Sequence, residues 1–291
     1  MQNKLAEIQG QGYGLAAISY DSTEVLAAFS RQRGITFPLL SDAGSATIQR
    51  YGLLNTVVDE ALGPNKDDAA VKSDTRKYVS GGGVRPMMAG IAFPGTIVID
   101  RSGRVTARYF EESYVERSTV SSVLVRAGAG KAPMSATKIA APHLELVTYP
   151  SDGEVAPGNR FSLVAEITPG RGIHVYAPGA TGYRAITLTL APGQPIRVLP
   201  MRYPASEVYS FKPLNEKVPV FQKPFRLVQE VVLEGTREAQ VALRGKDSVT
   251  LTGTLQYQAC DDKQCFNPAS LPLTWRLSLR PLVVERPSVA K

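Results

Sequence analysis

Residues 256–265 read Gln256-Tyr257-Gln258-Ala259-Cys260-Asp261-Asp262-Lys263-Gln264-Cys265 and hold both cysteines of the 291-residue chain. Before the first cysteine, apolar and polar side chains alternate from Thr254 onward, as in a half-buried strand. The alternation returns over residues 271–279, which predicts a hairpin turn at 261–264 with a cysteine on each side. Cα atoms that face each other across such a turn are about 4.5–5.5 Å apart, within range of a disulfide.

A bridge between these cysteines would close a very short loop. Through chain entropy it would contribute about 2 kcal/mol, the low end of what disulfides give. A chain of this length can bury an ordinary core and does not need that contribution. The pair therefore favours an exchangeable redox disulfide, with a static structural bridge as the alternative. A zinc site is disfavoured, since only His143 and His174 could complete the ligands, and we expect no metal and no cofactor.

Two motifs flank the pair, Tyr257-Gln258-Ala259-Cys260 before it and Cys265-Phe266-Asn267-Pro268 after it. Together they resemble the redox-active strand pair of the N-terminal domain of the DsbD family of thiol:disulfide interchange proteins. Asn267 stands where that family often has a proline. The resemblance implies an immunoglobulin-like β-sandwich over residues 143–282.

In that family the cysteine pair passes electrons to or from a thioredoxin-like or membrane thiol-disulfide redox protein. The resemblance therefore implies that Cys260 and Cys265 are the catalytic residues, with Tyr257 in support. It further implies that Cys260 engages the partner and that Cys265 resolves the mixed disulfide. The alternative from another class is a non-catalytic binding module with a static disulfide.

The same resemblance implies a cap over the disulfide. Residues 203–217 would form a loop that covers the sulfur atoms and moves aside for a partner, with Phe211 as the shield and Tyr209 beside it. Such a lid limits attack by unwanted thiols. His174 and Tyr176 lie two positions apart, so on a strand both face the same side, and the resemblance implies that this side stands beside the cysteines. For His174 a place capping the sandwich core is the alternative.

The first part of the chain predicts an α/β layer structure. Short apolar runs at 14–19 and 37–40 are typical of strands, and helical patterns begin near Asp21 and Ser41. Residues 96–100 and 105–110 predict an antiparallel hairpin around the turn at 101–104. Strand, helix, strand, helix and hairpin together indicate one α/β domain.

A second resemblance depends on four segments of the chain. They are residues 17–22, 37–42, Tyr51-Gly52 and 93–103. In combination they resemble the peroxiredoxin (AhpC/TSA) branch of the thioredoxin superfamily, over most of residues 1–110. The resemblance implies that Pro94 is the cis-proline of that fold, with an ordinary trans proline at a strand start as the alternative.

No cysteine occurs before residue 260. A thiolate is the nucleophile in peroxiredoxin chemistry, so we expect no peroxidase activity from this chain. Because Met1 falls within a predicted helix, we expect that the first strand, a reactive-cysteine segment and an export signal precede it. The alternative is a degenerate domain that has lost its thiol chemistry. Residues 1–8 show no signal-peptide pattern themselves, and the family resemblance implies an extracytoplasmic, periplasmic location.

Bulk properties exclude two classes of function. The formal net charge is +7, but the basic residues are scattered without a Lys/Arg run, so no nucleic-acid partner is expected. The longest uncharged run, residues 86–99, is too short to span a bilayer, so no membrane span is expected.

The expected organisation is a thioredoxin-like domain over 1–126, a linker over 127–142, the sandwich over 143–282 and a tail over 283–291. Within the first domain, residues 55–89 are expected to be an insertion with a possible short helix. After the linker no helix is predicted. Strands are predicted at 144–146, 161–167, 186–190, 227–233, 239–243 and 249–251, besides the cysteine hairpin.

Overall fold

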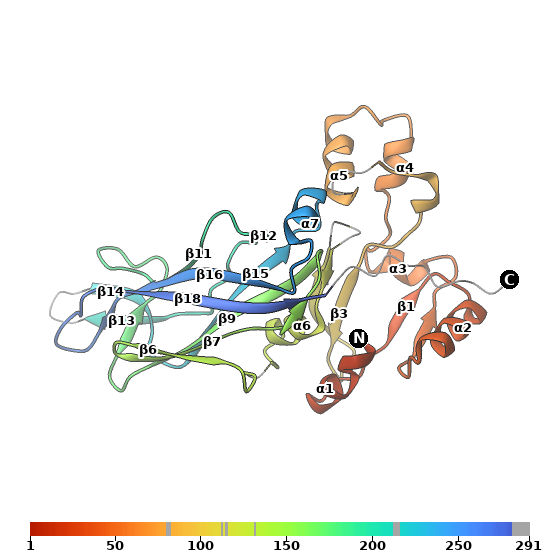
Figure 1. The fold of residues 1–291 in the computed structure, drawn as a ribbon. Coiled ribbons are helices and arrows are strands. Elements are labelled where there is room, and N and C mark those ends of the chain that lie inside the picture. The colour runs from red at the N-terminus through yellow and green to blue at the C-terminus, as the bar shows by residue number, and fades with distance from the viewer. Residues whose placement is uncertain (80–82, 112, 114–115, 131, 212–215, 281–291) are drawn as a thin grey trace. The chain divides into compact units, whose positions relative to one another are not determined.

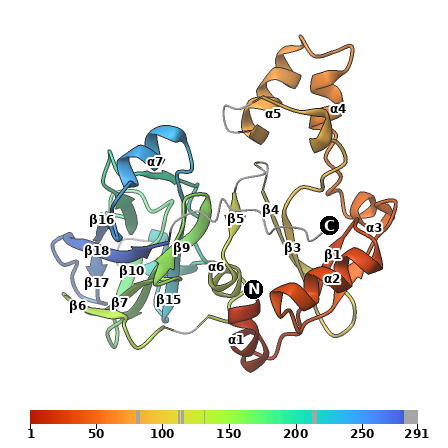
Figure 2. The same cartoon turned by 45° about the vertical axis from the view of Figure 1, so that its right-hand side comes forward.

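The computed structural model describes residues 1–79, 83–111, 113, 116–130, 132–211 and 216–280 (Figure 1). The chain divides into two compact units, Met1–Ala129 and Gly130–Lys291. The first unit mixes helices and strands, and the second is built almost entirely of strands (Figures 1 and 2). This is the predicted fold class, an α/β unit followed by a β-sandwich.

The α/β unit contains short elements in mixed order. They are η1 (Gln2–Lys4), α1 (Leu5–Gly10), β1 (Ala17–Ser19), α2 (Thr23–Arg33), β2 (Leu39–Ser41), α3 (Ala46–Arg50), α4 (Val57–Leu62), α5 (Ala69–Val79), η2 (Pro86–Met88), β3 (Gly95–Ile99), β4 (Val105–Phe110), β5 (Arg117–Ser118) and α6 (Val120–Arg126).

Its strands pair as the sequence pattern predicts. β1 and β2 are parallel, with Ile18 opposite Leu40, and β3 and β4 form the antiparallel hairpin. Helix α2 begins one residue later than Asp21 would suggest, because the Ser22 side chain accepts a hydrogen bond from the Val25 N–H and so acts as the N-cap. The helix ends at Gly34, whose left-handed conformation (φ 60°) suits a residue without a Cβ.

The peptide bond before Pro94 is not cis, since the described residues contain no cis peptide bond. The prediction of a cis-proline is therefore wrong. Pro94 lies directly before β3, where its carbonyl accepts a hydrogen bond from the Glu111 N–H. A proline at a strand start has no ladder hydrogen bond to lose, so the ordinary trans form fits there.

The described part of the insertion at residues 55–89 holds two α-helices, α4 and α5, and the 3-10 helix η2, rather than one short helix. Val58 on α4 and the pair Tyr78 and Val79 on α5 are buried together, with Phe93 at the edge of the cluster. The rings of Tyr78 and Phe93 meet edge to face, with centroids 5.6 Å apart. The insertion thus has a small apolar core of its own.

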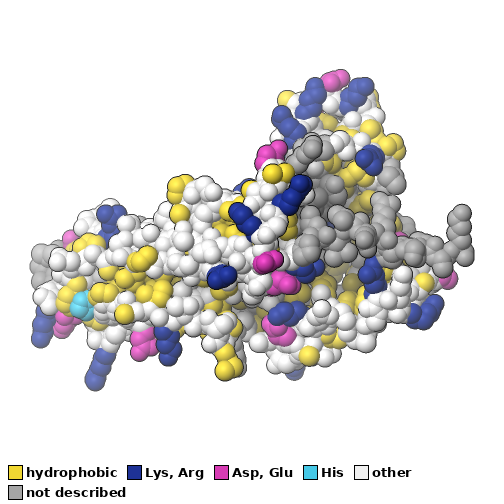
Figure 3. Space-filling view, in the orientation of Figure 1, with side chains coloured by type: hydrophobic (Ala, Val, Ile, Leu, Met, Phe, Trp, Pro, Cys, Tyr) yellow, Lys and Arg dark blue, Asp and Glu magenta, His cyan; other side chains and the backbone are white. Residues whose placement is uncertain are grey.

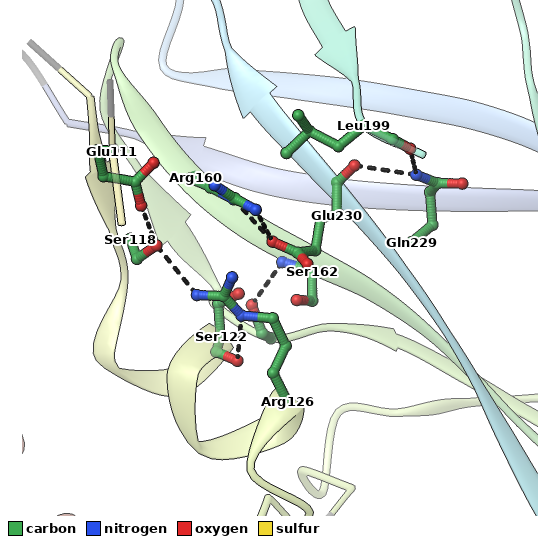
Figure 4. A network of polar contacts seen from close by, with 10 residues as sticks. Glu111, Ser118, Ser122, Arg126, Arg160, Ser162, Leu199, Gln229 and Glu230 are labelled. Atoms are coloured by element: carbon green, nitrogen blue, oxygen red, sulfur yellow. Dashed lines mark hydrogen bonds and ion pairs between the residues drawn. The ribbon is translucent and has the colours of Figure 1, made fainter. Parts of the chain in front are cut away.

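Polar contacts tie the end of the α/β unit together (Figure 4). The Ser118 hydroxyl donates to the Glu111 carboxylate, and Arg126 Nη2 donates to Ser118 Oγ over 3.0 Å. The Arg126 guanidinium also lies over the Tyr109 ring, 4.0 Å from its centroid. These contacts connect the strand end at β5 to helix α6.

The second unit is made of strands and one helix. They are β6 (Thr137–Ala141), β7 (Leu144–Pro150), β8 (Glu154–Val155), β9 (Asn159–Pro169), β10 (His174–Tyr176), β11 (Thr187–Leu190), β12 (Ile196–Val198), β13 (Glu207–Phe211), β14 (Glu216–Phe221), β15 (Phe225–Leu233), α7 (Arg237–Leu243), β16 (Ser248–Tyr257), β17 (Ala259–Cys260) and β18 (Ala269–Leu279).

Two of its sheets face each other as a sandwich. One has the strand order β12-β15-β9-β7-β6 and the other β11-β16-β18-β8. Their inner faces share one core, in which Leu163 and Leu227 from the first sheet meet Leu251 and Trp275 from the second. The buried Trp275 indole N–H donates to Thr148 Oγ1 across this core, over 2.8 Å. Trp275 is thus a core residue on the alternating apolar face of β18.

Polar pairs also hold neighbouring strands of the first sheet in register (Figure 4). Arg160 on β9 and Glu230 on β15 form an ion pair with Nη2 and Oε2 2.6 Å apart. Beside it, the Gln229 side-chain amide donates to the Leu199 carbonyl over 2.6 Å. These contacts connect β9, β15 and the segment after β12.

Two secondary-structure predictions in this unit are wrong. Residues 239–243 belong to α7 and not to a strand: Thr236 caps the helix by accepting from the Ala239 N–H, and Ala239 and Leu243 are buried while Val241 is 58% exposed. Buried residues four positions apart lie on one face of a helix. Apolar side chains also occupy every second position over 239–243, which is why the sequence predicts a strand there. Residues 137–141, expected within the linker, form β6 and pair with β7.

The strand before the first cysteine changes sheets. β16 pairs with β18 as far as Tyr257 opposite Ala269. After Gln258, the two residues of β17 join a third sheet instead, whose strand order is β13-β14-β10-β17. Figure 1 shows β13 and β14 of this sheet at one end of the unit. The cysteine hairpin therefore lies at that end, on a sheet separate from the main sandwich layers.

The surface shows no concentration of basic charge on the face drawn in Figure 3, where Lys and Arg side chains are scattered among acidic ones. In the described residues no helix is long and apolar enough to cross a membrane.

Candidate functional site

Cys260 and Cys265 form a disulfide across a tight turn. Their Cα atoms are 4.1 Å apart, and the two residues form an antiparallel bridge. Asp261 Oδ1 closes the turn by accepting from the N–H groups of Lys263 and Gln264, each over 2.7 Å. These hydrogen bonds lower the pKa of the Asp261 carboxyl, so it stays ionised and holds the turn over a wide pH range.

The two cysteines differ in exposure. Cys260 lies on β17 against β10 and is 1% exposed, whereas Cys265 follows the turn and is an exposed residue. An incoming thiolate can attack only a sulfur atom that it can reach. Access therefore favours attack at Cys265.

Tyr176 on β10 lies against both sulfur atoms. Its hydroxyl oxygen is 3.2 Å from Cys260 Sγ and 3.3 Å from Cys265 Sγ. Burial is the main cause that raises the pKa of Tyr176, with the hydroxyl of Tyr183 and the charge of Glu216 adding to it. The side chain therefore remains a protonated O–H that can donate to a sulfur atom.

Tyr183 extends this arrangement outward. Its ring stacks on that of Tyr176, with centroids 4.1 Å apart and planes 13° from parallel. Its hydroxyl donates to Glu216 Oε2 over 2.6 Å, and this hydrogen bond is the main reason that the pKa of Tyr183 is raised. The segment after β10 is thus connected to the start of β14 beside the disulfide.

His174 covers the other side of Cys260. It is opposite Cys260 in the register of β10 and β17 and is only 2% exposed. Its ring stacks on Tyr209 of β13, with centroids 4.3 Å apart, and meets Tyr176 edge to face at 5.4 Å. Burial lowers the pKa of His174, while the nearby charge of Asp261 opposes that effect. A neutral imidazole is therefore favoured at this position.

These groups enclose a cavity of about 150 Å³ beside the disulfide. Three tyrosine rings form much of its wall, from Tyr176, Tyr183 and Tyr209. Both cysteines line it, as do ionisable groups from β14 and from the hairpin turn. A small ligand in the cavity would therefore lie directly beside the disulfide.

The structure brings together only some of the predicted supporting residues. His174, Tyr176 and Tyr209 lie at the disulfide, but Tyr257 is a core residue whose hydroxyl donates to the Pro142 carbonyl over 2.8 Å. Pro94 belongs to the other unit. The predicted shield, Phe211, is on β13, but its side chain and residues 212–215 lie outside the described residues.

Two residues of the site were missed from the sequence, Tyr183 and Glu216. Tyr183 lies in an irregular segment between β10 and β11, where no strand or helix pattern points to a face. Glu216 is within the predicted cap segment, but nothing in its sequence neighbourhood marks a tyrosine 33 positions earlier as its partner. In the described residues no cluster of three or more His, Cys, Asp or Glu side chains could hold a metal ion.

The solved structures that match this chain are distant from it. The N-terminal domain of DsbD from Neisseria meningitidis, in its reduced form, is 10% identical, with 40% of this chain and 81% of that chain covered and a TM-score of 0.28. The N-terminal periplasmic domain of ScsB from Proteus mirabilis is 16% identical, with 47% of this chain and about half (49%) of that chain covered and a TM-score of 0.32.

A search of curated proteins found no significant match. The α/β unit does match a protein family. The AhpC/TSA family model matches residues 1–108, which confirms the resemblance drawn from the segments around β1, β2 and β3. The first 108 residues of the chain thus match the AhpC/TSA family.

Proposed function

We propose that the β-rich unit is a thiol-disulfide exchange module that passes electrons through Cys260 and Cys265 to or from a redox partner protein. The observation that supports this most directly is the disulfide itself, which joins a buried to an exposed cysteine across a short turn beside an open cavity. An attacking thiolate can therefore reach the bond more easily at Cys265 than at Cys260.

The exchange reaction is written for reduction of this protein by its partner. A partner thiolate attacks Cys265 Sγ. A bond forms between the partner sulfur and Cys265 Sγ, and the bond between Cys265 Sγ and Cys260 Sγ breaks. The electron pair passes to Cys260 as a thiolate, to which the Tyr176 hydroxyl can donate from 3.2 Å away. A second partner thiolate then attacks the partner's own sulfur in the mixed disulfide and releases Cys265. Two electrons are transferred, and the partner leaves as a disulfide.

This order reverses the roles implied by the family resemblance, in which Cys260 engages the partner. The difference in exposure between the two residues is the reason, because the buried Cys260 is covered by the rings of His174 and Tyr176. Burial makes the Cys260 thiolate a costly leaving group, which opposes this order, and the hydrogen bond from the Tyr176 hydroxyl offsets part of that cost. Cys260 is therefore suited to re-form the bond or release the partner quickly.

Opening the bond is expected to leave the unit folded. The ring between the cysteines is short, so its loss removes only about 2 kcal/mol of chain-entropy stabilisation. The apolar core of the sandwich lies between two other sheets and does not include the sulfur atoms of the pair. Cys260 instead belongs to a smaller cluster with Tyr176, Val218 and Val220.

The partner that we propose is a thioredoxin-like protein or a membrane thiol-disulfide redox protein, in an extracytoplasmic compartment such as the periplasm. An oxidising compartment is where a disulfide persists. We further infer that the α/β unit contributes no thiol chemistry of its own, since residues 1–259 contain no cysteine.

The experiment is a thiol-trapping titration of the full chain in a glutathione redox series. Exchange predicts a midpoint potential above about −300 mV, and unchanged secondary structure by circular dichroism when the bond is reduced. A pair that stays oxidised below about −300 mV, or whose reduction unfolds the β-rich unit, would make the disulfide structural and favour a non-catalytic binding module.

A further inference from the structure

We propose that the cavity beside the disulfide binds a small thiol that carries an ammonium group, an aminothiol, and directs its sulfur to Cys265. This inference rests on the proposed exchange function and names a class of substrate for it. Its basis is the combination of cavity size, wall chemistry and charge around one accessible disulfide.

The size of the cavity selects small ligands. Pockets for drug-sized molecules have volumes of about 300–1,000 Å³. The cavity here has about 150 Å³, which suits a molecule of about the size of one amino acid. It is bounded by β10, β14 and the cysteine hairpin, so any occupant lies within reach of the exposed sulfur of Cys265.

The charges in the wall favour a cation. The carboxylates of Glu216 and Asp261 line the cavity, against a single ammonium group from Lys263. Asp261 Oδ1 already accepts two backbone N–H groups within the turn, which leaves Glu216 as the carboxylate best placed for a ligand. Glu216 is held in place by the Tyr183 hydroxyl, which donates to its Oε2 without changing its charge.

The aromatic wall favours the same kind of ligand. The faces of tyrosine rings carry partial negative charge and attract ammonium groups at distances up to about 6 Å. Tyr176, Tyr183 and Tyr209 all line the cavity, and the stacking of Tyr183 on Tyr176 fixes the orientation of two of them. His174, also in the wall, adds no positive charge while it is neutral.

The chemical step is an ordinary exchange. The aminothiol loses its thiol proton to solvent, and its thiolate attacks Cys265 Sγ. The bond between Cys265 and Cys260 breaks, and its electron pair remains on Cys260 as a thiolate. The product is a mixed disulfide between Cys265 and the small thiol, and a second aminothiol molecule completes the reduction and leaves as the oxidised dimer.

The test compares four small thiols of different charge with the oxidised full chain. Each rate per thiolate concentration is divided by the rate of the same thiol with a small neutral disulfide, because the nucleophilicity of a thiolate rises with its pKa. The thiols are cysteamine (cation), cysteine (zwitterion), 2-mercaptoethanol (neutral) and 3-mercaptopropionate (anion). We expect cysteamine to react about two- to fivefold faster than 2-mercaptoethanol, and 3-mercaptopropionate to be the slowest.

Charge variants assign the preference to the cavity. Glu216→Gln keeps an acceptor for Tyr183 but removes the charge. The advantage of cysteamine, meaning the ratio of its rate to that of 2-mercaptoethanol, should therefore fall close to one. Asp262→Asn is the matched control, because this exposed carboxylate lies in the same turn but does not line the cavity, and it should keep the advantage. Lys263→Gln should increase the advantage of cysteamine.

The result that overturns this inference is equal reactivity of cysteamine and 2-mercaptoethanol in the wild type, or equal effects of Glu216→Gln and Asp262→Asn. Reduced thioredoxin serves as a separate probe of the proposed function. If thioredoxin reduces the disulfide but cysteamine shows no advantage, only the aminothiol inference fails. If neither thioredoxin nor any small thiol opens the bond, the exchange function itself fails.

Discussion

The two sulfur atoms of the disulfide lie in different surroundings although they are bonded to each other. Both line the cavity, but Cys260 is only 1% exposed beside β10 and its aromatic rings, while Cys265 is exposed to solvent. An enclosed thiolate is costly and an exposed sulfur is open to attack. At the scale of single residues, the asymmetry gives each cysteine a separate role.

Single cysteine variants test these roles. Cys260→Ala leaves Cys265 to form a mixed disulfide with a partner and removes the group that would release it, so a covalent complex should accumulate. Cys265→Ala should form no such complex, because the remaining Cys260 is only 1% exposed. The measurement is non-reducing electrophoresis after mixing each variant with a thioredoxin-like protein in its disulfide form. Trapping by Cys265→Ala instead would restore the roles implied by the family resemblance.

His174 should make stability depend on pH. Burial lowers its pKa in the folded protein, so below the unfolded value of about 6.5 the unfolded chain binds more protons than the folded one. The stabilisation is fully present above that value and is lost as pH falls through the folded pKa. His174→Phe keeps a ring against Tyr209 but does not titrate.

The measurement for His174 is chemical denaturation of the wild type and of His174→Phe from pH 8 to pH 5. We expect the difference between the two proteins to be constant near pH 8 and to shift in favour of the variant as the pH decreases. Carboxyl groups titrate in both proteins and cancel in the difference. A difference that does not change with pH would show that His174 is not held neutral by its surroundings.

Part of the site could be predicted from residues alone. The pairing of the cysteines follows from strand alternation beside a turn, and His174 and Tyr176 share a face because they lie two apart on a strand. Their place beside the cysteines was implied by the family resemblance alone. The partnership of Tyr183 and Glu216 could not be predicted, since it depends on how an irregular segment returns to β14. The exposure of Cys265 likewise depends on β17 leaving the sheet that β16 forms.

At the scale of elements, the neighbours that a segment contacts decide whether it forms a helix or a strand. Residues 239–243 satisfy both a strand pattern and a helix pattern, and only the cap by Thr236 and burial on one side select the helix. β6 has the composition of a linker but becomes a strand because β7 offers it a free edge. Local sequence left both segments ambiguous, and tertiary contacts resolved them.

Gly253 tests how closely the strands around the core approach one another. A Cβ at this position in β16 would lie 2.8 Å from the Thr189 carbonyl oxygen on β11 and 3.4 Å from Cζ3 of Trp275. Backbone at that distance cannot yield without moving β11, so Gly253→Ala should destabilise the protein by about 1–3 kcal/mol. The measurement is the free energy of unfolding from denaturant titration.

Gly153→Ala is the control for this variant, because a Cβ there would meet no atom within 4 Å. It should change the free energy of unfolding by less than about 0.5 kcal/mol. Equal effects of the two substitutions would mean that β11 and β16 are not packed as closely as the structure shows.

At the scale of the whole molecule, the chain is two units with separate cores. The apolar cluster around Val58 and Tyr78 belongs to residues 1–129, and the sandwich core belongs to residues 130–280. Only the first unit matches the AhpC/TSA family, and only the second carries cysteines. The proposed exchange function therefore needs the second unit alone.

Two fragments test this division and the place of its boundary. The fragment 130–280 should unfold cooperatively and keep the reactivity of the disulfide towards small thiols. A fragment that begins at residue 143 lacks β6, whose Ile139 and Ala141 pack against the sandwich core, and lacks the Pro142 carbonyl that accepts from Tyr257. Losing this apolar contact costs about 2 kcal/mol, so the shorter fragment should melt about 4–8 °C lower.

The measurement is thermal unfolding of both fragments, followed by circular dichroism, with the full chain beside them. The disulfide lies on the sheet β13-β14-β10-β17, which does not contain β6, so both fragments should keep the same exchange rate while folded. Equal melting temperatures would show that β6 adds nothing and that the linker reaches to residue 142. If the fragment 130–280 fails to unfold cooperatively, the sandwich depends on the α/β unit, and the exchange function belongs to the whole chain.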